Sequence, residues 1–252
     1  MPDSDTILQL VNVRKDLGNQ RVLDGLNLSV MHGETLVIMG RSGSGKSVIL
    51  KHMVGLMRPD DGEIFFDGRR LDVMERHQLR EVRKRMGMLF QSSALFDSMS
   101  VGENISLGLR KHTRLSAAEI ELVVEEKLNL VGLAGTSAKM PAELSGGMRK
   151  RVGLARAIAM DPELVFYDEP TTGLDPITAD SINELILDTR ESLGVTAVVV
   201  THEVANALKV GTRICLLDGG RIVYEGTPGE VRRTDHPLMD KFLAGTAGRA
   251  EA

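Results

Sequence analysis

Hydrophobic patterns along the chain predict an α/β protein. Residues 8–13 and 26–30 alternate apolar and polar positions, as half-solvated antiparallel strands do. Residues 35–39 and 164–167 are continuous apolar runs, which are typical of buried parallel strands. Apolar residues at helical spacing occur between these runs. We therefore expect an antiparallel β subdomain at the N-terminus and a parallel α/β core.

The segment from residue 92 to 160 interrupts the strands with helical patterns. Within it, Ser116 and Glu119 form a capping box ahead of a run with helical apolar spacing. A later helix begins at Asp175 and stops at Gly194. The pattern predicts that residues 92–160 are an α-helical subdomain inserted in the core.

The remaining apolar runs indicate the other strands and the domain boundaries. Further strands are expected at residues 63–66, 88–90 and 195–200, with a closing hairpin at 214–217 and 222–224. The chain is interpreted as one domain, residues 1–245, comprising a core at 1–91 and 161–225, the helical subdomain, and a C-terminal helical segment at 226–244. A flexible tail is expected at 245–252, because GTAGRAEA has little to bury.

A basic helix is predicted at residues 79–86, which read LREVRKRM. Its four Arg and Lys residues allow two interpretations. A charge run on a helix is usually a solvated face, and this interpretation is favoured. The alternative is contact with lipid headgroups or with a partner.

A glycine-rich loop, GRSGSGKS at residues 40–47, follows a predicted strand and precedes residues with helical spacing. This context indicates a phosphate-binding P-loop rather than a glycine-rich surface turn. In such a loop the backbone N–H groups surround the phosphates, Lys46 reaches the β and γ oxygens, and Ser47 binds Mg²⁺. The residues expected at the nucleotide are Gly40, Arg41, Ser42, Gly43, Ser44, Gly45, Lys46, Ser47 and Val48.

A second anion site is predicted where Ser145, Gly146 and Gly147 open a helix. Ser145 stands at the N-cap position, so the first turn presents free backbone N–H groups and the positive end of the helix dipole. The two glycines allow an anion to approach the backbone closely.

Polar residues end several of the predicted parallel strands. Asp168 and Glu169 follow the run at 164–167, at the strand end where ligands of open α/β sheets bind. Their mutual repulsion favours a nearby cation, for which Mg²⁺ is the candidate. Gln91 and His202 also follow strands. The alternatives are an ordinary solvated carboxylate for Glu169 and a hydrogen-bonded structural histidine for His202. The presence of the other motifs in the chain favours functional roles for both residues.

Composition and charge exclude several classes of protein. The chain has 252 residues and a net charge of −4, which argues against nucleic acid as a partner. The lone Cys215 excludes an internal disulfide and fits a reducing compartment. The start, MPDSDTILQL, lacks the features of a signal peptide, and no apolar run approaches the roughly 18 residues that span a bilayer. Any membrane role is expected to come through a partner.

Taken in order, the segments GRSGSGKS, Gln91, LSGGM, LVFYDEP, GLDP and His202 resemble the motifs of the ATP-binding cassette ATPases, over nearly the whole chain. The resemblance implies a RecA-like P-loop NTPase core with an N-terminal antiparallel β subdomain and an inserted α-helical subdomain. It also implies ATP and Mg²⁺ as cofactors and ATP hydrolysis as the reaction.

The resemblance assigns roles to individual residues. Glu169 matches the general base for the attacking water, and Asp168 matches the Walker B carboxylate that holds Mg²⁺, partly through water. Gln91 matches the Q-loop residue that senses the γ-phosphate and Mg²⁺, and His202 matches the switch histidine at the γ-phosphate. Asp175 matches the D-loop residue that crosses the dimer interface. The implied metal ligands are Ser47, Gln91 and Asp168.

In this family LSGGM belongs to the opposite subunit's site, so the resemblance implies a head-to-tail homodimer with two shared ATP sites. The chain departs from the family at Met148, where Gln is usual. It also lacks the aromatic residue that stacks on adenine upstream of the P-loop, because no Phe, Tyr or Trp precedes Phe65. Lys15 falls at that position, and Val22 is an aliphatic neighbour that would pack on the base.

Within the family, VRKRMGMLFQSSALFDSMSVGENI, LRKHT and LSGGM are most similar to the ATPase subunits of Mla/Mce-type phospholipid transport systems. The resemblance implies an integral-membrane permease, lipid-binding Mce-type and small accessory subunits, and a place on the cytoplasmic face of the inner membrane. It places permease docking after Gln91, at Ser93, Leu95, Phe96 and Met99. For Leu95 and Phe96, a place in the core is an equal alternative.

Two other functions stay open at this point. The cargo could instead be an amino acid, a peptide, a metal complex or a drug, because the ATPase does not touch it. A soluble regulatory or DNA-repair cassette protein is disfavoured, since such proteins tend to have two cassettes, long coiled coils or basic surfaces, none of which the sequence contains.

Overall fold

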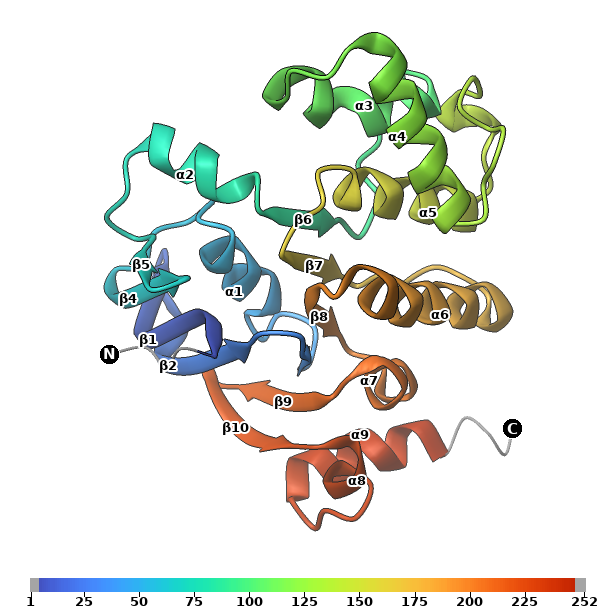
Figure 1. Ribbon diagram of the computed structural model, residues 1–252. Helices are drawn as coiled ribbons and strands as arrows, with labels where there is room; N and C mark the ends of the chain where they lie inside the picture. Colours follow the sequence, from blue (N-terminus) through green and yellow to red (C-terminus); the bar gives the residue numbers. More distant parts are fainter. Residues whose placement is uncertain (1–4, 248–252) are drawn as a thin grey trace. The chain divides into compact units, whose positions relative to one another are not determined.

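The computed structural model describes residues 5–247, which form two compact units (Figure 1). Within the described residues, the first unit comprises residues 5–79 and 196–247, and the second comprises Arg80–Val195. Helix α2 (Arg76–Arg83) contains the boundary between them. The domain boundaries that we expect from the sequence stay a prediction.

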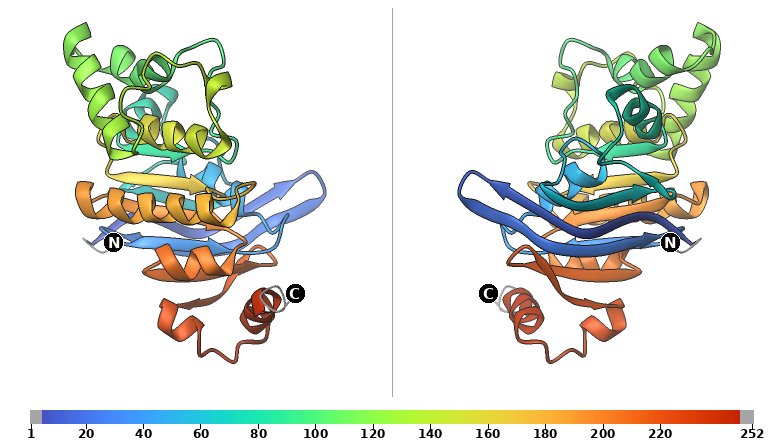
Figure 2. Two further views of the ribbon diagram at one scale, coloured as in Figure 1. Left: turned by 90° about the vertical axis from the view of Figure 1, so that its right-hand side faces the viewer. Right: turned by 90° about the vertical axis from the view of Figure 1, so that its left-hand side faces the viewer.

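An antiparallel sheet forms the N-terminal part of the first unit. Its strand order is β2-β1-β4-β5, and Figure 2 shows β1 and β2 as a long hairpin. The bounds are β1 Thr6–Leu17, β2 Gln20–Met31, β4 Asp61–Phe66 and β5 Arg69–Arg70. Within the predicted stretches, Leu8 and Leu10 of β1 and Leu26, Leu28 and Val30 of β2 are buried, and the residues between them are more exposed, which confirms the half-solvated strands that the pattern predicts.

The parallel strands of the first unit are buried along their length. Strand β3 (Thr35–Met39) pairs in parallel with both β8 (Thr196–Thr201) and β9 (Arg213–Asp218), and β10 (Arg221–Gly226) closes a hairpin with β9. The helices of this unit are α1 Lys46–Met53, α7 Val204–Val210, α8 Pro228–Val231 and α9 Pro237–Ala247. Because α9 continues to Ala247, it includes the first residues of the predicted tail, and residues 248–252 lie outside the described residues.

The second unit combines two parallel strands with a group of helices. Strands β6 (Met86–Leu89) and β7 (Leu164–Asp168) pair in parallel, and α3, α4 and α5 pack together (Figure 1). The helices are α3 Val101–His112, α4 Ala117–Leu130, η1 Pro141–Glu143, α5 Gly146–Ile158 and α6 Pro176–Leu193. The predicted capping box at Ser116 and the helix limits at Asp175 and Gly194 are confirmed.

Both limits of the basic helix differ from the prediction. The basic helix is α2, which ends at Arg83, because Met86 already pairs with Leu164 in the sheet. The helix after the glycine-rich loop ends at Met53, since Gly55 adopts a left-handed conformation and Leu56 is 58% exposed. Within the described residues, no helix has the length and hydrophobicity required to cross a membrane.

Candidate active site

The glycine-rich loop of the first unit turns from the end of β3 into the start of α1. Gly43 and Gly45 have φ angles of 80° and 103°, in the left-handed region that glycine adopts without strain. A Cβ atom at Gly45 would lie 3.1 Å from the side chain of Val22, so glycine also permits the close approach of β2. The loop therefore has the backbone that a phosphate cradle requires.

Lys46 lies inside this loop with only 7% of its surface exposed. Its ammonium group donates to the carbonyl oxygens of Gly40 at 2.7 Å and Arg41 at 3.0 Å. Ser47, in the first turn of α1, is exposed. A cation is thus fixed beside the backbone amides, as the binding of a phosphate chain requires.

Strand pairing brings His202 to the same end of the sheet as the loop. Met39 of β3 is paired in register with Thr201 of β8, so Gly40 and His202 leave the sheet at neighbouring positions. His202 is exposed, and the next residue, Glu203, donates its backbone N–H to the Thr201 hydroxyl at 3.1 Å. The first unit therefore presents the loop and the histidine at one sheet edge.

The second unit brings Gln91 and Asp168 together in the same way. Leu89 of β6 pairs with Tyr167 of β7, and a cavity of about 430 Å³ beyond these strand ends is lined by Phe90, Gln91, Ser92, Asp168 and Thr172. Carboxylate, amide and hydroxyl oxygens are the hard ligands that Mg²⁺ prefers. Among the described residues, no three His, Cys, Asp or Glu side chains form a metal cluster. This donor set fits Mg²⁺ that completes its coordination with phosphate and water.

Glu169 occupies a strained position next to this cavity. Its φ angle is 48°, which is uncommon for a residue other than glycine, and it is only 9% exposed. The hydroxyl of Thr172 donates to its Oε2 atom at 3.3 Å. Strain of this kind persists where surrounding contacts fix a functional group, which agrees with a positioned carboxylate.

Lys150 is a site residue that the sequence reasoning missed. Its buried ammonium group, on α5, donates to the carbonyl oxygens of Gln91 at 2.5 Å and Glu169 at 3.2 Å. Burial lowers the pKa of this lysine, while the charges of Asp168 and Glu169 oppose that effect. Spacing along the helix could have revealed it, because Lys150 shares a buried face with Leu154 and Ile158.

The start of α5 has the predicted geometry of an anion site. Ser145 is the N-cap, and its hydroxyl accepts the backbone N–H of Met148 at 3.2 Å. A Cβ atom at Gly147 would lie 2.5 Å from the methyl group of Thr178, so α6 approaches this turn closely. Asp175 caps α6, and its hydrogen bond from the Thr178 hydroxyl lowers the pKa of its carboxyl group.

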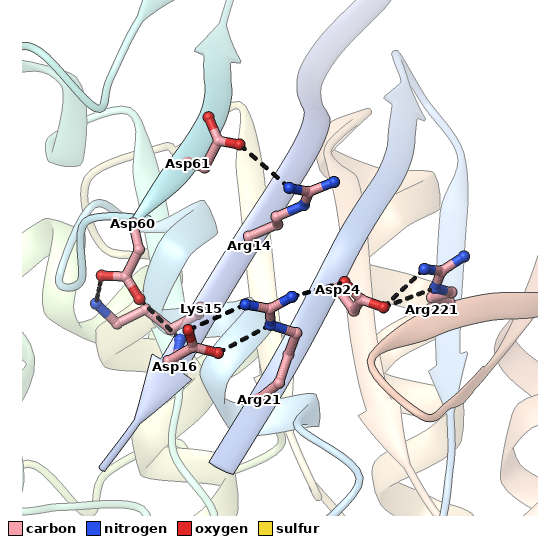
Figure 3. Close-up of polar contacts among 8 residues, drawn as sticks. All are labelled: Arg14, Lys15, Asp16, Arg21, Asp24, Asp60, Asp61 and Arg221. Atoms are coloured by element: carbon pink, nitrogen blue, oxygen red, sulfur yellow. Dashed lines mark hydrogen bonds and ion pairs between the residues drawn. The ribbon is translucent and has the colours of Figure 1, made fainter. Parts of the chain in front are cut away.

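Lys15 and Val22 differ in their relation to the glycine-rich loop. The ammonium group of Lys15 is bound to Asp60 at 2.7 Å (Figure 3). Val22 lines a cavity of about 280 Å³ together with loop residues, and Lys15 is absent from that lining. Among the residues expected after Gln91, Phe96 is 50% exposed, Leu95 is half-buried and Ser93 is buried.

Comparison with known proteins identifies the family. The family model described as ABC transporter matches residues 23–172, which is more than half of the chain. The chain belongs to the ABC transporter family. It is 44% identical over 230 residues to the intermembrane phospholipid transport system ATP-binding protein MlaF of Escherichia coli K12, covering 91% of this chain and 86% of that protein.

Two further comparisons extend this result. A probable ribonucleotide transport ATP-binding protein, mkl of Mycobacterium leprae, is 40% identical over 94% of this chain and 69% of its own length. The dimeric post-hydrolysis state of the ATP-binding cassette MJ0796 bound to ADP and Pi superposes with a TM-score of 0.81, at 33% identity, over 88% of this chain and 98% of that one. The predicted P-loop NTPase fold is thus confirmed, and the chain is an ATPase of this family.

Proposed function

We propose that this chain is the ATP-hydrolysing subunit of a phospholipid transport system and drives an integral-membrane permease. The observation that carries the proposal is the 44% identity to MlaF, which extends over 91% of this chain and 86% of that relative. Met148, which stands where most of the family has Gln, is consistent with the same subgroup.

In this mechanism the chain's own residues position the phosphates and one water. The loop amides and Lys46 hold the β and γ phosphates, and His202 contacts the γ-phosphate from the same sheet edge. Glu169 accepts a proton from the attacking water, and Gln91 senses the γ-phosphate. Mg²⁺, held by Ser47, Gln91 and Asp168, would neutralise charge on the phosphates.

Two copies of the chain would share two ATP sites. Each chain carries one P-loop and one segment 145–147, whose first-turn amides suit a γ-phosphate held by the neighbouring copy. The dimeric relative bound to ADP and Pi supports this arrangement. ATP would close the pair, with Asp175 at the interface, and hydrolysis would reopen it.

A cavity of about 460 Å³ in the second unit supports permease docking. Its lining combines basic side chains, including Arg80, Arg83 and Lys111, with apolar residues such as Met88 and Phe90. Basic residues of the predicted helix at 79–86 therefore line this cavity, and the helix is not only a solvated charged face. We place the permease here and at Phe96, with Mce-type and small accessory subunits beyond it. The chain would then lie on the cytoplasmic face of the inner membrane.

The name of the mycobacterial relative suggests a second cargo. That protein is described as a probable ribonucleotide transporter and is 40% identical to this chain. The ATPase residues would serve either cargo, because the cargo contacts the permease.

Mass spectrometry of the purified complex distinguishes the two cargoes. The chain is isolated with its membrane partners in detergent, and bound small molecules are extracted. We expect phospholipid above the level found in a control preparation of an unrelated ABC transporter. Recovery of ribonucleotide without enriched phospholipid would refute the lipid assignment and leave the ATPase assignment intact.

A further inference from the structure

We propose that the guanidinium plane of Arg21 is the stacking surface for the nucleobase of bound ATP, in place of an aromatic side chain. The proposal rests on the ATPase function and adds a specific binding residue to it. The ligand class is a planar purine joined to a triphosphate.

The first observation is the cavity of about 280 Å³ beside the phosphate loop. It is lined by Arg21 and Val22 of β2, by loop residues such as Ser42 and Gly43, and by the turn between β9 and β10, including Gly219. A triphosphate held by this loop places its nucleoside near one end of the loop, and this cavity is directly adjacent to it. No aromatic side chain lines the cavity.

The turn that closes the cavity is fixed against β2. The backbone N–H of Asp24 donates to the carbonyl oxygen of Gly220 at 3.1 Å, and a Cβ atom at Gly220 would lie 2.7 Å from the carbonyl oxygen of Val22. Glycine is therefore required for this close approach. This wall of the cavity is thus a preformed part of the fold.

The second observation is the way Arg21 is held (Figure 3). Its guanidinium donates to both carboxylate oxygens of Asp16, at 3.0 and 3.3 Å, and forms an ion pair with Asp24 at 3.5 Å. The N–H groups of a guanidinium lie in its plane, so partners on its edges leave the two flat faces available. The side chain is 53% exposed. Guanidinium planes stack well on nucleobases.

Lys15 and Val22 are less suited to this role. The ammonium of Lys15 has no flat face and is bound to Asp60. Val22 lines the same cavity and offers only an apolar contact on the base. Asp16 and Asp24 pair with Arg21, and Asp24 also pairs with Arg221, so several groups share the charge around the guanidinium.

The test compares a nucleotide with its phosphate chain alone. Dissociation constants of the full-length chain are measured with Mg²⁺ for a non-hydrolysable ATP analogue and for inorganic tripolyphosphate. We expect Arg21→Ala to weaken the analogue about three- to tenfold and to leave tripolyphosphate unchanged. Arg21→Lys should weaken binding of the analogue by the same factor, because lysine keeps the charge but lacks the flat guanidinium. Arg21→Tyr should restore the affinity for the analogue, because it supplies a flat ring.

Arg221→Ala is the matched control. Arg221 binds the same Asp24 at 2.7 Å but does not line the cavity, so its loss should leave both affinities unchanged. Wild-type affinity in Arg21→Lys, or equal weakening of both ligands in Arg21→Ala, would overturn the proposal. A wild-type chain that binds neither ligand would instead contradict the ATPase function itself.

Discussion

Glu169→Gln is expected to lower the rate of ATP hydrolysis about 100- to 10,000-fold while leaving ATP binding intact. The substitution removes the only part of the side chain that can accept a proton from water and keeps its shape and its contact with Thr172. The phosphate loop and Lys46 are unchanged. Phosphate release from the purified complex and binding of a non-hydrolysable analogue measure the two effects separately.

Glu191→Gln provides the control for this variant, because it makes the same chemical change at an exposed carboxylate of α6. It should hydrolyse ATP at the wild-type rate. Wild-type turnover in Glu169→Gln would show that another group activates the water, and a loss of binding would show that the substitution disturbs the site as a whole.

Lys150→Met is expected to reduce turnover about tenfold to a hundredfold, with little change in ATP affinity. Its ammonium fixes the backbone of both Gln91 and Glu169, and a shift of about 1 Å in a catalytic group can cost that much. Methionine has a similar length and is apolar, so it fills the space that the lysine side chain occupies. Rates and affinities are measured together with the melting temperature, because the loss of a donor costs about 1–3 kcal/mol for each buried carbonyl.

Two companion variants separate positioning from stability. Lys150→Arg keeps a donor at this position and should recover part of the turnover. Lys139→Met changes an exposed lysine of the same unit and should have no effect. If the Lys150→Met protein melts at a lower temperature yet hydrolyses ATP at the wild-type rate, Lys150 has a structural role only.

The fold could be predicted where local signals decide the structure. The strand at 35–39, the capping box at Ser116 and the helix from Asp175 to Gly194 depend on neighbouring residues, and all are confirmed. The end of α2 depends on the pairing of Met86 with Leu164, which lies far away in sequence. The pattern of neighbouring residues around Met86 therefore does not predict where the helix ends.

The candidate site shows the same division. The phosphate loop and the carboxylates at the end of β7 follow from glycine spacing and strand ends, and strand register then brings Gln91 to Asp168. Lys150 and Arg21 could not be assigned in this way. Their roles depend on carbonyl and carboxylate partners brought by other elements, as with the Arg21 contacts to Asp16 and Asp24.

ATP-driven movement of phospholipid is the most direct test of the account. The chain is reconstituted with its permease and accessory subunits in vesicles, and transfer of a labelled phospholipid to an acceptor is followed with and without Mg-ATP. The account predicts transfer that requires Mg-ATP and stops in Glu169→Gln. Transfer at the same rate without ATP, or in Glu169→Gln, would contradict it.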